Sequence, residues 1–137
     1  MARDDGFSLI ELLVAMLIIV ALAAIALPAF LGQRTKGQDA AAKSALATTG
    51  LAALTYYTDH DSFDGMTVTA LQKVDPSLKD EPAGSGLAVD SASGEAYKLH
   101  LTHPDSGHVF TIERSSGKDK HTCSPAGQGG CSAAGDW

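Results

Sequence analysis

Hydrophobic and polar positions follow two patterns: a continuous apolar run near the start of the chain, and an alternation of apolar and polar residues in its last third. No residue from Leu12 to Leu31 carries a charge. A run of roughly twenty residues makes an α-helix about 30 Å long, which matches the hydrocarbon core of a bilayer. The run therefore predicts a membrane-spanning helix, which we place within residues 7–34.

The chain becomes polar after Gly32 but keeps a helical period, so we expect the same helix to continue to about residue 58. The apolar positions of this continuation recur near helical spacing and predict a buried stripe: Ala42, Leu46, Ala53, Leu54 and Tyr57. Lys43, Ser44 and Thr48 are expected to face solvent. Gly37 is the expected weak point, since glycine costs about 1 kcal/mol relative to alanine in a helix interior.

The middle of the chain predicts short elements and loops. Asp59–Gly65 is acidic and is expected to be a solvated turn; Phe63 and Ala70 stand at calcium-ligand positions, which disfavours an EF-hand. Thr67 or Thr69 can cap a short helix that runs to about Val74 and ends before Pro76. Residues 79–86 are expected to be a connector.

Alternating residues in the last third predict a small antiparallel sheet. Two strands are expected at residues 95–102 and 108–114, joined by a hairpin loop at residues 103–107. Residues 87–90 and 120–123 can add one strand on each side. The fold class is therefore α+β, with a long N-terminal helix that packs on three or four antiparallel strands.

Composition limits the candidate functions. A chain of 137 residues, part of which forms the apolar segment, leaves one small head domain. Its net charge of -6 and its scattered basic residues argue against nucleic-acid binding of the usual basic kind. Ser115–Lys118 matches S-x-x-K without the partner motifs of that enzyme class, and no phosphate loop is present. We expect no enzyme activity and no cofactor.

Glu11 is a carboxylate near the start of the apolar segment. An unpaired ion in such surroundings costs about 2 to 4 kcal/mol or more, and no Lys or Arg lies within the next twenty residues. A cut between Gly6 and Phe7 would create an ammonium group at the head of the helix. The sequence therefore suggests the N-terminus of a second copy as the partner of Glu11. Pro28 removes a backbone hydrogen bond and predicts a kink or a loosened turn.

In this order, Gly6, Phe7, Glu11, the apolar run and Pro28 resemble the leader and stalk of type IV pilins over about the first 35 residues. The resemblance implies a prepilin leader at residues 1–6, an assembly helix at residues 7–34 and an exported head at residues 35–137. It implies cleavage after Gly6 by prepilin peptidase and N-methylation of Phe7 by the same enzyme. The precursor would cross the cytoplasmic membrane once, and the pilus assembly platform and its ATPase would then build an extracellular helical homopolymer.

Two observations oppose this interpretation, and two other N-terminal segments compete with it. Asp4 and Asp5 oppose Arg3 in the leader, and the positive-inside rule alone would leave the head in the cytoplasm. A secretory signal peptide could be cut at the small residues of 21–26, but its apolar region is shorter and has no counterpart of Glu11. A plain membrane anchor leaves Glu11 and Pro28 unexplained.

Cys123 and Cys131 enclose the loop SPAGQGG and allow two interpretations. They form a disulfide in an exported head, or they bind zinc with His121, for which no fourth ligand is in reach. The resemblance supports the disulfide, because many pilins close their C-terminal end with one. His100, His103 and His108 surround one hairpin, and we expect them to be exposed polar surface and not a metal site.

The leading hypothesis is a structural subunit of a type IV pilus, with adhesion, twitching motility or DNA uptake as its roles. The nearest alternative is a pseudopilin of a type II secretion or competence apparatus. The C-terminal cysteine pair favours a pilin, since the major pseudopilins lack this disulfide. A membrane-anchored binding module with a histidine metal site is the alternative from another class, and it requires that the stalk stay uncleaved.

Overall fold

The computed structural model describes residues 6–137. The part of the expected leader from Met1 to Asp5 lies outside the described residues. The chain divides into two compact units, one ending at Arg34 and the other comprising Thr35–Trp137.

A single α-helix, α1, comprises Leu9–His60 and contributes to both units. It continues through Pro28. It also continues through Gly37, where the sequence indicated that the helix could break. Its last turn extends beyond the expected end. There His60 stacks on Tyr56 with ring centroids 4.0 Å apart, and its Nδ1 lies 2.9 Å from the Tyr56 carbonyl oxygen.

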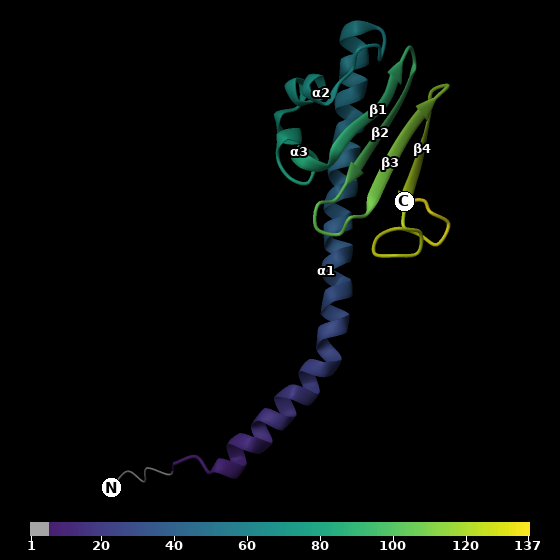
Figure 1. Ribbon diagram of the computed structural model, residues 1–137. Helices are drawn as coiled ribbons and strands as arrows, with labels where there is room; N and C mark the ends of the chain where they lie inside the picture. The colour runs from purple at the N-terminus through teal and green to yellow at the C-terminus, as the bar shows by residue number, and fades with distance from the viewer. Residues whose placement is uncertain (1–5) are drawn as a thin grey trace. The chain divides into compact units, whose positions relative to one another are not determined.

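The unit from Thr35 onward contains one four-stranded antiparallel sheet in the order β1-β2-β3-β4 (Figure 1). The strands are β1 (Leu87–Ser93), β2 (Ala96–Thr102), β3 (Val109–Ser115) and β4 (Lys118–Ser124). Consecutive strands pair with each other, so the sheet is a meander. The α+β fold with a helix packed on a small antiparallel sheet is confirmed, and β1 and β4 are longer than the sequence predicted.

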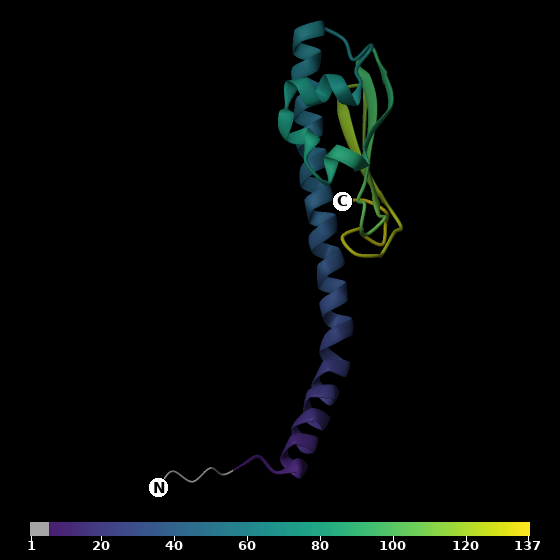
Figure 2. The same cartoon turned by 60° about the vertical axis from the view of Figure 1, so that its left-hand side comes forward.

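The core of this unit lies between the sheet and the part of α1 from Thr35 onward. Figure 2 shows the sheet alongside this part of the helix. Leu46 and Ala53 of α1 have no exposed surface, and neither do Leu99 of β2 and Phe110 of β3. The predicted stripe is confirmed at Ala42, Leu46 and Ala53. It is wrong at Leu54, which is 37% exposed. Tyr57 is only half-buried.

Three short helices lie beside the edge of the sheet that β1 forms: α2 (Val68–Val74), the 3-10 helix η1 (Pro76–Lys79) and α3 (Ala83–Gly86). Thr67 caps α2, because its Oγ1 accepts a hydrogen bond from Ala70 N at 3.2 Å, and this prediction is confirmed. The connector expected at residues 79–86 contains the short helix α3, and the 3-10 helix η1 ends at its first residue. The Asp75 side chain caps η1 by accepting from Ser77 N at 2.9 Å.

The acidic segment at residues 59–65 contributes a side chain to the core, which the sequence did not predict. Phe63 is 2% exposed and packs edge-on against Tyr97, with ring centroids 4.8 Å apart. Its backbone N–H donates to Gly94 O at 2.8 Å, and Gly94 N donates to Asp64 Oδ1 at 3.1 Å. The segment is therefore tied to the β1–β2 turn, and the expectation of a solvated turn is wrong at Phe63.

Candidate functional site

The residues around the start of α1 carry the candidate processing site. Gly6 and Phe7 precede the helix and are exposed. Ser8 occupies the N-cap position, directly before Leu9, and its backbone N–H donates to Glu11 Oε2 at 3.1 Å. This is the reach-back contact of a capping box, in which an acidic residue at the third helical position satisfies the free N–H of the cap.

The capping contact gives Glu11 a role that the sequence analysis missed. The signal was present, since Ser8, Leu9, Ile10 and Glu11 form the pattern S-x-x-E. The sequence predicts a cationic partner for Glu11, and the structure adds a backbone donor on the same chain. A carboxylate at this end also interacts favourably with the helix dipole. Glu11 therefore helps to define where α1 begins.

The first unit exposes its apolar side chains on every side. Every residue from Gly6 to Arg34 is exposed, and the large apolar side chains range from 49% exposure at Val14 to 86% at Phe7. Among the described residues, α1 is the one helix long and apolar enough to cross a membrane. Burying such surface is strongly favourable, so this segment is suited to a lipid or protein environment.

The comparisons with known proteins concern this same segment. Residues 1–27 match the prokaryotic N-terminal methylation motif. The chain carries a type IV prepilin-like signature. Neither the curated proteins nor the solved structures gave a match. The signature and the apolar helix support a precursor in the inner membrane that is processed by prepilin peptidase and handled by a pilus assembly machinery.

The prepilin-like signature includes Gly6, Phe7 and Glu11, whereas Pro28 lies one residue beyond it. Pro28 is inside α1 and exposed. The cleavage, methylation and assembly roles of these four residues stay predictions. The structure brings Glu11 close to the backbone just after the predicted cut, because Ser8 N is its hydrogen-bond donor.

At the other end of the chain, Cys123 and Cys131 form a disulfide with an S–S distance of 2.03 Å. Cys131 is buried, and Cys123 lies in β4. Because both sulfurs are engaged, the zinc alternative with His121 does not describe this part of the chain. The His121 ring instead lies 4.6 Å from the Trp137 ring.

The histidine cluster is not the exposed surface that we expected. His103 and His108 are each only 8% exposed. His100 is half-buried, and its Nδ1 lies 2.7 Å from Asp90 Oδ1. Within residues 6–137, no three His, Cys, Asp or Glu side chains are grouped so that they could hold a metal ion.

Asp39 of α1 is the centre of a buried polar cluster that the sequence analysis missed. It has no exposed surface, and its carboxylate accepts hydrogen bonds from Ser106 Oγ at 3.0 Å, His108 Nδ1 at 2.7 Å and Gly130 N at 2.7 Å. Burial alone would raise the pKa of Asp39. The hydrogen bonds from Gly130, His108 and Ser106, with the charge of His108, outweigh burial and hold this pKa below its ordinary value.

Lys43 lies one turn further along α1 and also contacts Gly130, although the sequence predicted that it would face solvent. It is half-buried, its Nζ donates to Gly130 O, and it lies 5.6 Å from the centroid of the Phe110 ring. Asp39 and Lys43 therefore bind the N–H and the carbonyl of one residue. Glycine is required beside them, because a Cβ at Gly129 would lie 2.1 Å from Asp39 Oδ2.

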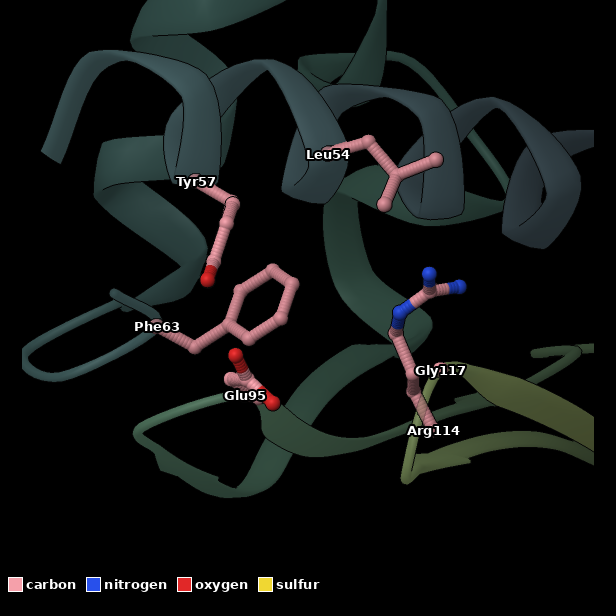
Figure 3. A pocket seen from close by; sticks show the side chains of 6 residues that line it. All are labelled: Leu54, Tyr57, Phe63, Glu95, Arg114 and Gly117. Carbon is pink, nitrogen blue, oxygen red and sulfur yellow. The ribbon is translucent and has the colours of Figure 1, made fainter. Parts of the chain in front are cut away.

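A small cavity of about 200 Å³ lies between α1 and the β1–β2 and β3–β4 turns (Figure 3). Leu54 and Tyr57 of α1 line it together with Phe63, and Glu95 and Arg114 supply opposite charges. Arg114 is already paired with Asp119, with Nη1 2.8 Å from Oδ1. The cavity is smaller than the range of about 300 to 1,000 Å³ typical of small-molecule sites, so it carries no ligand proposal.

Proposed function

We propose that the chain is a structural subunit of a type IV pilus. The observation that carries this proposal is an exposed apolar helix whose first residues match the prepilin-like signature. The proposed role is structural and not catalytic. Adhesion, twitching motility and DNA uptake are the roles that such a filament would serve.

Cleavage after Gly6 would change the chemistry at the start of α1. Hydrolysis of the Gly6–Phe7 bond converts an uncharged amide nitrogen into an ammonium group, and N-methylation keeps that positive charge. Glu11 of a neighbouring subunit would neutralise this ammonium group in the dry filament core. The pairing offsets the cost of burying either charge alone, which is several kcal/mol.

Apolar burial would supply most of the cohesion. Each large apolar side chain that becomes fully buried contributes about 1.5 to 3 kcal/mol, and the first unit exposes many of them. Alanine at positions 21, 23, 24, 26 and 29 keeps part of the helix surface small, which permits close helix packing. The ion pair would then fix the register between neighbouring helices.

The disulfide favours a pilus subunit over the pseudopilin alternative. Cys123–Cys131 closes a C-terminal loop whose residues 124 and 126–129 are exposed. A displayed loop of this kind suits a filament that faces the cell exterior. Cell-surface filaments composed of this chain support the pilus proposal, and short periplasmic assemblies without surface filaments would assign it to the pseudopilins.

The decisive experiment compares the wild-type chain with Glu11→Ala in cells that assemble it. We expect the wild type to begin at methylated Phe7 by mass spectrometry and to appear in sheared surface filaments. Glu11→Ala should be processed and remain in the membrane without entering filaments. Asp59→Ala is the matched control, because this exposed carboxylate lies at the other end of α1. Normal filaments from Glu11→Ala would remove Glu11 from the mechanism.

A further inference from the structure

A cleft lies in the head between the last turns of α1 and the helix α2, which Figure 1 shows beside α1. Its volume is about 530 Å³, within the range of about 300 to 1,000 Å³ that is typical of small-molecule sites. One wall is lined by Thr55, Asp59 and His60 of α1, and the other by Ala70, Lys73 and Val74 of α2. The cleft shares no residue with the processing site or with the Asp39 cluster.

The α1 wall of the cleft presents hydrogen-bond acceptors. His60 Nδ1 lies 2.9 Å from the Tyr56 carbonyl oxygen, which can only accept, so Nδ1 donates and the neutral ring keeps Nε2 as an acceptor. The Thr55 hydroxyl donates its proton to Leu51 O at 3.1 Å, which leaves its own oxygen as an acceptor. Asp59, one turn beyond Thr55, is an exposed carboxylate. A ligand on this wall must therefore supply O–H or N–H donors.

The His60 ring is held in place by the protein itself. It stacks on the Tyr56 ring, with centroids 4.0 Å apart and ring planes 12° from parallel. Tyr56 is fixed in turn, because it is buried and its hydroxyl donates to Asp64 O at 3.1 Å. A group that is already ordered loses little side-chain freedom when a ligand binds, which favours affinity. His60 therefore offers a preorganised acceptor.

The α2 wall supplies the opposite chemistry. Lys73 carries an exposed ammonium group, which can only donate, and the apolar residues Ala70 and Val74 are half-buried. No ion pair within residues 6–137 includes Lys73 or Asp59, so both charges can interact with a ligand. Because one group is positive and the other negative, Asp59 and Lys73 together carry no net charge.

We propose that this cleft binds an uncharged sugar residue at the end of a glycan. The hydroxyl groups of a sugar donate to Asp59 and to His60 Nε2 and accept from Lys73, and its C–H groups pack on Ala70 and Val74. A carboxylate or phosphate ligand has no donor for the α1 wall and would face the like charge of Asp59. A cationic ligand would face Lys73. The balanced charges therefore favour a neutral polyol.

The inference rests on the proposed function only for its biological role, which is adhesion of the filament to glycans. Asp59, His60 and Lys73 are exposed, so the cleft is open to a sugar that remains part of a longer glycan. Binding can be measured without filaments. A chain that forms filaments but binds no sugar would overturn the inference and leave the proposed function intact. A chain that binds sugar without forming filaments would do the reverse.

Amide NMR of the full chain, in micelles of a phosphocholine detergent that carries no sugar, tests the site. The probes are the methyl glycosides of glucose, galactose and mannose. We expect at least one of them to give saturable shifts at residues 55–60 and 70–74, with a Kd of about 1 to 10 mM. The uronic acid and the amino sugar of the same configuration should bind about tenfold more weakly. The absence of saturable shifts with all three glycosides, or equal binding of a charged counterpart, would overturn the proposal.

Single substitutions test which groups contact the sugar. Asp59→Ala and Lys73→Gln should each weaken binding about tenfold, and because both side chains are exposed the unfolding midpoint of the head should not change. His60→Phe keeps an aromatic ring on Tyr56 but removes Nε2, so it should weaken binding to a similar extent. Lys79→Gln is the matched control, because this exposed lysine belongs to η1 and lies outside the cleft. Wild-type affinity in both Asp59→Ala and Lys73→Gln would refute the site.

Discussion

The two parts of α1 are one helix in secondary structure but differ in what they bury. From Leu9 to Arg34 every residue is exposed, although most are apolar. From Thr35 to His60 the sequence is more polar, yet seven residues are buried along one stripe: Asp39, Ala42, Leu46, Thr49, Ala52, Ala53 and Tyr56. Apolar composition alone therefore does not place a residue in a core. The second part packs against the rest of the head, whereas the apolar surface of the first part can be buried only against groups outside its own unit.

Each part also carries a carboxylate in an unusual position. Glu11 is exposed among apolar residues and has the Ser8 N–H as its donor. Asp39 is fully buried and accepts from three groups on two loops. The difference indicates that Asp39 has a structural role that is complete within the chain, whereas Glu11 keeps capacity for a further partner.

Replacing Gly6 with leucine should abolish maturation. A bulky side chain directly before the predicted cut obstructs the peptidase, so we expect no processed protein and no filaments. Mass spectrometry of the membrane fraction would show an unprocessed N-terminus. Gly37→Ala is the matched control, because a Cβ at Gly37 meets no atom within 4 Å, and its processing should be normal. Wild-type processing of Gly6→Leu would count against the cleavage site.

Leucine-to-alanine substitutions in the two parts should differ sharply in their effect on the head. Leu46 has no exposed surface, so Leu46→Ala should lower the free energy of unfolding by about 2 to 5 kcal/mol. Leu17 is 65% exposed, so Leu17→Ala should leave the unfolding of the head unchanged. The single tryptophan, Trp137, packs on Phe110 and provides a fluorescence signal for denaturant titration in micelles. Equal losses in both variants would refute the division of α1 into two parts.

The sequence predicted the elements because their signals are local. Helical period, strand alternation and the Thr67 cap each act within a few residues, and these predictions are confirmed. The capping box at Ser8 and Glu11 is equally local, and its S-x-x-E pattern is sufficient to predict it. The Asp39 cluster could not be found in this way, because its donors lie 67 to 91 residues away in the sequence.

The same limit explains the errors at single residues. Phe63 lies within an acidic, loop-like stretch, and its contacts with Tyr57 of α1 and Tyr97 of β2 show that it belongs to the core. His103 and His108 flank a hairpin turn, where polar residues are usually exposed, yet both are buried. His108 is covered by Asp39 of α1 and by Gly129 of the C-terminal segment. Whether a polar residue is buried depends on which distant segments pack against it. The local sequence pattern holds no information about those segments.

Removing the disulfide should have an intermediate effect that is confined to the head. The double variant Cys123→Ser/Cys131→Ser opens the loop and should lower the free energy of unfolding by about 2 to 3 kcal/mol, since the unfolded chain gains freedom. Trp137 fluorescence during guanidinium unfolding measures this loss. Processing after Gly6 should remain normal, because the cut lies in the other unit. A variant that unfolds like the wild type would show that the loop contributes little to stability.

The smallest expected effect distinguishes Asp39 from Glu11. Asp39→Asn leaves at least one of the three donors to this side chain poorly satisfied and should destabilise the head by about 1 to 3 kcal/mol at neutral pH. Glu11→Gln should not change the unfolding of the head. Because the pKa of Asp39 is lowered on folding, its contribution is complete above its ordinary value of 3.8 and is lost as the pH falls through the lower folded value.

The wild-type head should therefore lose stability relative to Asp39→Asn only in strong acid. Unfolding midpoints measured from about pH 7 to about pH 2.5 should converge for the two chains at the acidic end, where both carry an uncharged side chain at position 39. Asp90→Asn is the control, since its partly exposed pair with His100 should contribute less than about 1 kcal/mol. A constant difference between wild type and Asp39→Asn across this range would mean that the charge of Asp39 does not stabilise the head.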